Sequence, residues 1–554
     1  AAAATVGVAH IHIMAQSEGE SCETRVELPV RPAAAWSRFT GTEKIPAGER
    51  VTLRLPTEFL AGTTTATLVV SGRPSAQLLA AARFNAHYPY GCLEQVVSAA
   101  FPLLYLNEIQ QASLSHAETT RGMALKVQAV MEQLAAMQTT AGGLAMWPGG
   151  RKPWTWGSIY AAHFLVEAQR AGFDVWPEQL ELLLDWISKR VLLFAQMDKL
   201  SDSQLTERAY ATLVMARAGR NVRDHMELLY DVRNRLSSSA RALLASAYLS
   251  MGSVSEADTL LGMAEIGSER RDRGLLLSSP VRETAILLAA STERDPASPQ
   301  GVALANRLLG MRRPDLGHWG TTQDNAFALW ALGKYFGSAK QADADAHGAV
   351  EWGEGNRVQF TTTNPAVLTL QSPDQPITIQ NTGRGVAYAS WVVEGVPAKP
   401  DLQAKSRGLQ LTRKLLSRSG KPLETANLTQ GQLIIVELAL KGGSVPLPNV
   451  VIEDLLPACL EIENPNLAST EQAGETDSFE GAKLPVTRWD ARDDRMIVFA
   501  DLPGGEEGKE YVFRYACRVV SAGEFVQPPA YATCMYDADV SAQTEAGSLT
   551  VRPR

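Results

Sequence analysis

Residues 87–106 read HYPYGCLEQVVSAAFPLLYL and place a cysteine, Cys92, three residues before a glutamine, Gln95. An apolar stretch with helical spacing begins at Cys92, and Pro89 and Gly91 favour a tight turn into that helix. Side chains three residues apart at a helix start lie on one face. Free N–H groups there favour a thiolate and stabilise a developing oxyanion. The pair therefore predicts an internal thioester, formed when the sulfur displaces ammonia from the Gln95 amide.

Such a bond is an acylating agent. A lysine amine or a hydroxyl would attack the Gln95 carbonyl, and Cys92 would leave as a thiolate. Because water would destroy the bond, it has to be kept dry until it reacts. Four aromatic residues are candidate covers, three of them near the cysteine and one in the loop GGLAMWPGG: Tyr88, Tyr90, Phe101 and Trp147.

Two other interpretations of Cys92 stay open at this point. A single cysteine on an apolar helix is commonly a small buried hydrophobic residue. Alternatively, Cys92 is the nucleophile of a hydrolase with His87 or His163 as its base. The papain-type signature around a nucleophilic cysteine is absent from the sequence.

Composition describes an ordinary globular chain that is too long for one core. The 554 residues are 45% hydrophobic and 20% charged, and the net charge is −8, which argues against nucleic acid as the main partner. No apolar run has the length of a transmembrane helix, and AAAATVGVAH shows no signal peptide. We expect either a cytosolic protein or the mature or truncated piece of a longer one.

The cysteines and histidines predict neither a disulfide scaffold nor a metal site. Cys517 alternates with the apolar residues of 511–519, which indicates a core position. An oxidising compartment would permit a pair among Cys459, Cys517 and Cys534, whereas Cys22 has no evident partner. There is no CxxC or HExxH, and His10 and His12 share one face of a predicted strand, as surface residues.

Three textures follow one another along the chain. Residues 1–79 and 343–554 have the alternation of β-strands, as in LIIVELAL and EYVFRYACRVV. From about 80 to 340 the period is helical, with a helix over Met123–Met137 and Ala-rich segments that end at glycine, such as IYAAHFLVEAQRAG. These segments repeat at about the length of a helix hairpin, and they suit a solenoid or a ring.

The stretch YPYGCLEQ resembles the thioester motif of the alpha-2-macroglobulin and complement family, in which Cys-x-Glu-Gln follows Pro-Tyr-Gly. WPGGRKPWTWGSIYAAHFLVEAQRAG, HWGTTQDNAFALWALGKYF and FVQPPAYATCMYDADV resemble bacterial members, so the resemblance spans essentially the whole chain. It implies a multidomain protein: an α/α-toroid thioester domain inserted in a CUB-like β domain, followed by a macroglobulin-type β-sandwich.

With that resemblance, we expect five segments. Residues 1–18 are the tail of a preceding macroglobulin-like sandwich. Residues 19–79 and 343–402 are the two halves of the CUB-like domain. Residues 80–342 are the helical thioester domain, and residues 403–554 are the C-terminal macroglobulin-like sandwich.

The resemblance also assigns residues. Cys92 and Gln95 form the thioester, and Gly91 and Glu94 belong to its motif. Tyr88 and Tyr90 fall where bacterial members carry shielding aromatics, and Trp147 is a further candidate shield. Met535 and Tyr536 match a Met-Tyr pair that packs over the bond in bacterial members, although an ordinary turn or core pair fits them equally well. The bond is an internal cross-link, so we expect no cofactor.

One departure from complement relatives concerns the acyl acceptor. Some of them place a histidine roughly 110–120 residues after the cysteine, where it favours hydroxyl targets. The corresponding region here, AQMDKLSDSQLTERAYATL, contains no histidine. The resemblance therefore implies direct attack by amines, and hence coupling to lysine side chains.

The resemblance implies the C-terminal part of a broad-spectrum protease-trapping inhibitor that is consumed as it reacts and is not an enzyme. A bait region elsewhere in a longer protein would be cut by the protease. A bacterial member would serve defence in the periplasm, tethered to the inner membrane by a lipidated N-terminus, with possible cell-envelope partner proteins. Two alternatives remain: a covalent adhesion or opsonin-like module, or a helical-toroid enzyme with a structural Cys92 and acids such as Asp185 or Asp202.

Overall fold

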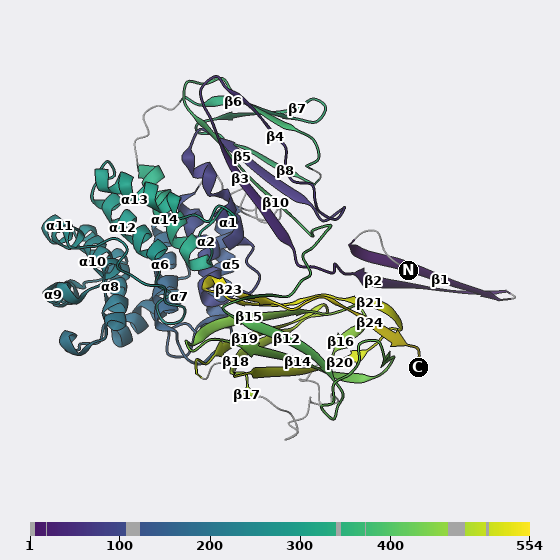
Figure 1. Cartoon of the computed structure of the whole chain (residues 1–554). Helices are drawn as coiled ribbons and strands as arrows, with labels where there is room; N and C mark the ends of the chain where they lie inside the picture. Colours follow the sequence, from purple (N-terminus) through teal and green to yellow (C-terminus); the bar gives the residue numbers. More distant parts are fainter. Residues whose placement is uncertain are drawn as a thin grey trace. The chain divides into compact units, whose positions relative to one another are not determined.

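The computed structural model describes residues 6–17, 19–106, 122–338, 345–371, 373–463, 482–505 and 509–554. The chain divides into two compact units (Figure 1). One unit comprises Ala1–Ser37, Thr57–Thr64 and Glu394–Arg554, and the other comprises Arg38–Pro56 and Thr65–Val393. The second unit contains Cys92 and all of the described helices.

Helices occupy the predicted central part of the chain. In order, the described α-helices and the short η2 are α1 (Leu79–Ala86), α2 (Leu93–Ala100), η2 (Phe101–Tyr105), α5 (Gly122–Met137), α6 (Thr155–Arg170), α7 (Pro177–Trp186), α8 (Asp202–Arg217), α9 (Arg223–Asp231), α10 (Ser238–Ser250), α11 (Val254–Gly262), α12 (Pro280–Arg294), α13 (Pro299–Gly310) and α14 (Thr322–Ser338). In α5 the buried residues are those that the sequence spacing singled out, from Met123 to Met137. The predicted end of the helical block at 342 lies outside the described residues.

Six of these helices contact one another in a closed ring, in the order α2, α6, α8, α10, α12, α14 and back to α2. They run in the same direction, because contacts join first turn to first turn and last turn to last turn, as between Glu94 and Thr322 or Arg217 and Glu293. Small side chains allow this close approach, and Ala161, Ala162 and Gly157 are all buried in α6.

Strands from both sides of the helical block pair with each other. One sheet has the order β3 (Ser37–Ile45), β10 (Ala387–Gly395), β5 (Thr65–Ser71), β8 (Ala366–Leu370). The other has the order β4 (Arg50–Leu53), β9 (Ile377–Asn381), β6 (His347–Trp352), β7 (Asn356–Thr361). The helices are therefore an insertion between strands that share two sheets, as the pattern of three textures suggested.

The other unit is built from strands. Its largest sheet has the order β11 (Lys405–Arg407), β23 (Asp537–Gln543), β22 (Ala530–Cys534), β15 (Leu447–Leu455), β19 (Arg495–Leu502), β18 (Val486–Ala491). A second has the order β12 (Gln410–Leu416), β14 (Leu433–Lys441), β20 (Tyr511–Val519), β16 (Leu460–Ile462), with β17 (Ala482–Lys483) beside β20. A third has the order β13 (Leu428–Thr429), β24 (Gly547–Arg552), β21 (Gly523–Gln527). Their shared core includes Cys517, which confirms its predicted core position.

The first two strands form a separate ribbon. All residues of β1 (Gly7–Ser17) pair with β2 (Glu20–Val30), so residues 20–30 join β1 instead of the sheets of the helical unit, where the predicted boundary at 19 had put them. His10 and His12 are exposed on β1, as predicted, and face Glu27 and Glu23 across the ribbon.

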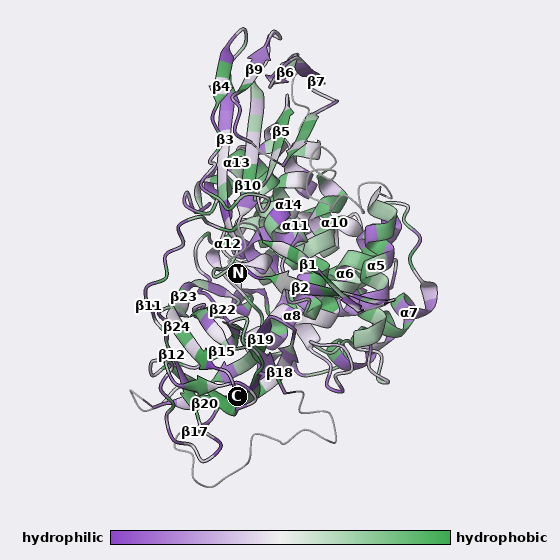
Figure 2. Ribbon diagram, turned by 90° about the vertical axis from the view of Figure 1, so that its right-hand side faces the viewer, coloured by the Kyte–Doolittle hydropathy of each residue, from purple (hydrophilic) through white to green (hydrophobic). Residues whose placement is uncertain are grey.

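Hydrophobic residues run through the helices and sheets of both units, as the green segments of Figure 2 show. Across the described ranges, no helix has both the length and the apolar character needed to cross a membrane. The described His, Cys, Asp and Glu residues form no group of three or more that could hold a metal ion.

Candidate functional site

The turn before α2 is built as the sequence predicted. Gly91 has a φ of +72°, a left-handed backbone conformation that glycine adopts without strain. Cys92 follows as the N-cap residue, with φ −70° and ψ 167°, and the helical ladder begins with the bond from Val96 N–H to the Cys92 carbonyl, 2.9 Å. Gln95 is the third residue of the helix, so both side chains face its first turn.

A capping box joins the two residues. The backbone N–H of Cys92 donates to the side-chain oxygen Oε1 of Gln95 at 3.1 Å, so the Gln95 amide folds back toward Cys92. That N–H polarises the carbonyl, and it would stabilise negative charge on Oε1 when a nucleophile adds to the carbonyl carbon. One turn of helix thus brings the side chains of Cys92 and Gln95 to the same helix start.

Among the described helices the same box occurs once more, where it serves only to cap a helix. At the start of α8, Ser201 N–H donates to Gln204 Oε1 at 3.0 Å. The box by itself is therefore not evidence of chemistry. Two features set the α2 box apart: a sulfur replaces the hydroxyl, and Cys92 and Gln95 are 0% and 2% exposed, whereas Ser201 is exposed.

A loop between α5 and α6 lies against the start of α2. Leu93 N–H donates to the Met146 carbonyl at 2.9 Å, which brings the next residue, Trp147, to the same end of the helix. Gly157 of α6 approaches so closely that a Cβ there would lie 2.7 Å from Leu93 Cδ2. Trp147 is half-buried, and its role as a cover of the bond stays a prediction.

The tyrosines before the turn belong to a row of rings. Tyr90 packs edge-on against Tyr88 at 5.4 Å between centroids, Tyr88 lies 5.3 Å from Phe84, and Phe84 lies 4.2 Å from His318. Tyr88 and Tyr90 are half-buried, so they border the turn without being part of the core. Phe101 lies deeper, 4.8 Å from the ring of His163.

Glu94 is fully buried and ties α2 to its neighbours in the ring. It accepts hydrogen bonds from Ser98 Oγ and from Thr322 Oγ1 of α14, the latter at 2.7 Å. Ser98 also bonds the hydroxyl of Tyr160 on α6, 3.1 Å away. Sequence reasoning assigned Glu94 only to the motif. Its partners come from residues far away in the chain, so no local signal identified them.

The histidines give no support to a cysteine hydrolase. His163 is buried, its Nδ1 lies 2.9 Å from the Tyr210 hydroxyl, and its Nε2 lies 3.2 Å from a nitrogen of Arg217. Burial and the charge of Arg217 lower the pKa of His163 to about 3, so it stays neutral and engaged. His87 is exposed at the end of α1, whereas Cys92 is not exposed at all.

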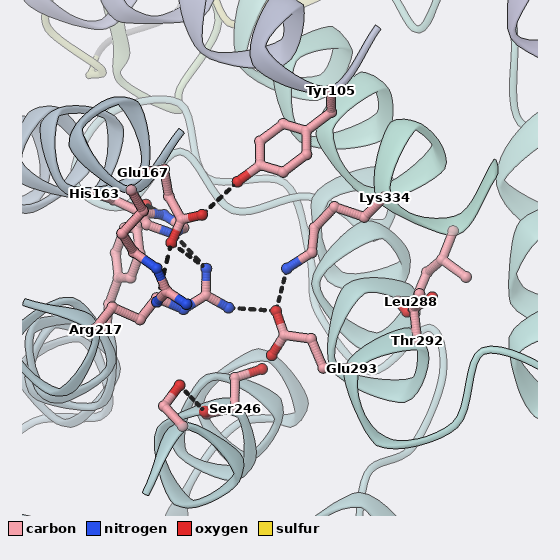
Figure 3. Close-up of polar contacts among 12 residues, drawn as sticks. Tyr105, His163, Glu167, Arg217, Ser246, Leu288, Thr292, Glu293 and Lys334 are labelled. Atoms are coloured by element: carbon pink, nitrogen blue, oxygen red, sulfur yellow. Dashed lines mark hydrogen bonds and ion pairs between the residues drawn. The ribbon is translucent and has the colours of Figure 1, made fainter. Parts of the chain in front are cut away.

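A second polar cluster lies among the last turns of the ring helices (Figure 3). Arg217 bonds Glu167 at 2.8 Å and also contacts Glu293, which in turn contacts Lys334. Tyr105 donates to Glu167 at 2.6 Å. Burial raises the pKa of both carboxyl groups, but Arg217, Lys334 and the hydrogen-bonding neighbours together outweigh burial and bring each pKa to about 2. Every member has a charged or hydroxyl partner, which is the arrangement of a structural ion network.

The remaining predicted residues lie elsewhere. Met535 and Tyr536 are buried at the turn between β22 and β23, in the unit that does not contain Cys92, so their packing over the bond stays a prediction. Asp185 pairs with Lys189 on α7 and is 54% exposed, and Asp202 is 82% exposed at the start of α8. Neither acid lies in a buried site of the kind that the enzyme alternative needs.

Fold and site together define a class of protein in which a helical domain, carrying a buried Cys-x-Glu-Gln turn, is inserted between strands and accompanied by a β-rich unit. A sequence model of the bacterial alpha-2-macroglobulin MG10 domain matches residues 408–539. The chain is 26% identical over 571 residues to alpha-2-macroglobulin of Xylella fastidiosa, a match that covers 96% of this chain and 33% of the relative. The chain is a homologue of the bacterial alpha-2-macroglobulins, which confirms the resemblance seen in the motif.

Solved structures agree in fold. Native Escherichia coli alpha-2-macroglobulin, spanning domain MG7 to the C-terminus, superposes with a TM-score of 0.78 at 23% identity, covering 99% of this chain and 88% of that one. Salmonella alpha-2-macroglobulin reacted with methylamine superposes with a TM-score of 0.75 at 23% identity, covering 99% and 36%. The chain thus corresponds to the C-terminal region of these proteins and spans 33% of the length of the Xylella relative.

Proposed function

We propose that Cys92 and Gln95 form an internal thioester and that the chain is the C-terminal part of a protease-trapping inhibitor. The observation that carries the proposal is the buried capping box in which the Cys92 N–H holds the Gln95 carbonyl. The thiol adds to the Gln95 carbonyl carbon, the C–N bond breaks, and the amide nitrogen leaves as ammonia with the thiol proton. The product joins Sγ to the former amide carbon.

The bond is then used once. An amine adds to the Gln95 carbonyl, the carbon–sulfur bond breaks, and Cys92 leaves as a thiolate, so Gln95 ends as a substituted amide. Because the protein is consumed, it is an inhibitor and not an enzyme. Methylamine is such an amine, and the Salmonella relative was solved after reaction with it.

The finer assignments belong to the same proposal. The ring of helices is the toroid of a thioester domain inserted in a CUB-like domain, and the shields of the bond are Tyr88, Tyr90, Trp147, Met535 and Tyr536. Lysine side chains of attacking proteases are the targets, after cleavage of a bait region in a longer parent protein. The parent works in the periplasm, anchored to the inner membrane by a lipidated N-terminus, and needs no cofactor.

Intact mass with and without methylamine tests the proposal. Freshly prepared protein should be one ammonia lighter than its sequence mass, and methylamine should add once and release one titratable thiol. Cys92→Ala should abolish the mass deficit and the labelling, whereas Cys517→Ala, at another buried cysteine, should retain both. Fresh protein that never labels and whose Cys92 alkylates freely from the start would contradict the thioester.

The choice of nucleophile separates the trap from the opsonin-like alternative. A short peptide with one lysine and a matched peptide with one serine are offered to the protein at equal concentration. Coupling to the lysine peptide alone supports amine targets, as the missing histidine implies. Equal or preferred coupling to serine would favour a module that labels hydroxyl-rich surfaces.

A further inference from the structure

The first turns of four ring helices each bring a buried polar group that has no hydrogen-bond partner among the described residues. These are the indole Nε1 of Trp156 on α6, the hydroxyl of Ser239 on α10, Nε and Nη2 of Arg282 on α12, and the amide of Gln323 on α14. The four residues are at most 1% exposed. Buried polar groups are normally paired, so such a set at one end of the ring calls for an occupant.

Three of these groups lie in one packing layer. The Arg282 guanidinium carbon stands 4.3 Å above the ring of Trp156 and 5.6 Å from the ring of Phe327. Phe327 itself stacks 6.5 Å from Trp156. Gln323 lies one turn before Phe327 on the same face of α14, because residues four apart share a face. Arg282 and Trp156 are therefore in contact where α6 and α12 begin, and Gln323 lies one turn from their neighbour Phe327 at the start of α14.

The guanidinium is only partly engaged. Nη1 of Arg282 donates to the Leu276 carbonyl, and two N–H groups on Nη2 and one on Nε remain. Three carboxylates act on Arg282 through space, namely Glu269, Asp272 and Asp324. These carboxylates accept hydrogen bonds from other groups. Glu269 accepts from the Ser239 N–H, and Asp272 accepts from the backbone N–H groups of residues 274–277. Asp324 accepts from the Ser279 hydroxyl and from Arg271.

The unpartnered donors at this end of the ring can hold a negative ligand, because the buried carboxylates of Glu94 and Asp324 at the same end already accept hydrogen bonds from other groups. Helix N-termini carry partial positive charge, and here several converge around a full positive charge. The unpartnered groups are mostly donors: guanidinium, indole, hydroxyl and amide N–H. Because all four residues are enclosed, the occupant has to be small.

We propose that a small monovalent inorganic anion of the size of chloride binds between Arg282, Trp156 and Gln323, at the end of the ring where α2 also begins. It accepts hydrogen bonds from Arg282 Nε and Nη2 and from the other donors of the layer. The site goes beyond the proposed thioester, because neither Cys92 nor Gln95 contributes to it.

Bromide locates the site directly. Crystals of the full chain grown in sodium bromide should show an anomalous peak within hydrogen-bond distance of Arg282 Nε or Nη2. Density at this position without an anomalous signal would indicate ordered water and would overturn the proposal. Side chains of Arg282, Trp156 and Gln323 that pack directly against one another, with no density between them, would overturn it as well. This measurement needs no variant.

Thermal unfolding tests the affinity in solution. Sodium chloride is exchanged for sodium gluconate at constant ionic strength, so that general screening does not change. Chloride should raise Tm saturably by roughly 2–4 °C. Gln323→Met, which keeps the volume and removes the amide, should halve the rise or reduce it further, and Arg282→Met should abolish it.

Arg294→Met is the control for the general effect of replacing an arginine on α12. Arg294 lies at the other end of α12, bonds Asp258 and is 41% exposed. Arg294→Met should retain the full response to chloride. A rise that does not saturate, or one that Gln323→Met leaves unchanged, would refute the site even if Arg282→Met fails to fold.

Discussion

The backbone N–H of Cys92 donates a 3.1 Å hydrogen bond to the side-chain oxygen of Gln95, and both residues are buried at the first turn of α2. The bond folds the Gln95 side chain back toward the backbone of Cys92 within one turn of helix. It also places a donor where charge develops when the carbonyl is attacked. The proposed reactivity depends on this local relationship.

The variant Gln95→Glu distinguishes the two roles of Gln95, as a helix-capping residue and as the proposed acyl donor. A carboxylate oxygen still accepts from the Cys92 N–H, but a carboxylate is a poor acyl donor and has no ammonia to release. We expect a folded protein without a mass deficit, with a titratable Cys92 thiol and no methylamine adduct, by mass spectrometry. Gln204→Glu changes the same position of the α8 box and should leave deficit and adduct intact. Labelling of Gln95→Glu would show that another residue supplies the acyl group.

Thr322→Val removes one hydrogen bond to a buried carboxylate. Valine has the shape of threonine without its hydroxyl, so Glu94 loses the 2.7 Å bond that links α2 to α14. We expect unfolding free energy to fall by about 1–3 kcal/mol, by urea denaturation. Thr284→Val is the control, since Thr284 is equally buried but bonds the Pro280 carbonyl of its own helix. Equal losses for the two variants would mean that the Glu94 bond adds nothing.

Acid should destabilise the helical unit through His163. The pKa of His163 falls from 6.5 to about 3 on burial beside Arg217. Between pH 6.5 and 3, His163 is therefore protonated in the unfolded chain and neutral in the folded chain. Stability is therefore lost as pH falls from about 6.5 to 3, with a slope of up to about 1.4 kcal/mol per pH unit from this residue. Urea unfolding between pH 7 and 4 should give a shallower slope for His163→Gln, and the wild-type slope for His347→Gln on β6.

More strongly acidic conditions should affect the ion network of Figure 3. Glu167 and Glu293 have pKa values lowered from 4.5 to about 2, so the stability that they contribute is complete above 4.5 and is lost as pH falls toward 2. Arg217→Met should remove this dependence and destabilise the protein at neutral pH, because it leaves two buried carboxylates without their main partner. An acid transition that is the same in Arg217→Met and wild type would contradict the assignment.

Gly157→Ala should distort the start of α2. A Cβ at 157 would stand 2.5 Å from Trp154 and 2.7 Å from Leu93, the residue after Cys92, so the neighbours have to shift. We expect a loss of about 1–3 kcal/mol in urea denaturation, together with a lower yield of methylamine adduct. Gly262→Ala on α11 meets no atom within 4 Å and should stabilise the protein by about 0.5–1 kcal/mol instead. A neutral Gly157→Ala would show that the helices are not held this close.

Much of the architecture was predictable because helices and strands show short-range periodicities of hydrophobic residues in the sequence. The 3.6-residue spacing identified the core face of α5, and alternation placed Cys517 inside its sheet. Which strands pair with which was harder to predict from the sequence. Residues 20–30 have the same alternation as any strand, so nothing local indicated that they pair with β1 instead of the sheets of the helical unit.

The candidate site divides along the same line. Cys92 and Gln95 are three residues apart, and one turn of helix fixes their relationship, so the sequence by itself determined the candidate pair and the chemistry proposed for it. Three features depend on residues far apart in the chain: the burial of the pair, the hydrogen bond that Thr322 donates to Glu94, and the polar layer around Arg282. These residues come together only when the helices close into a ring. The sequence does not show which helices pack together, because contacts between helices leave no periodic pattern in it.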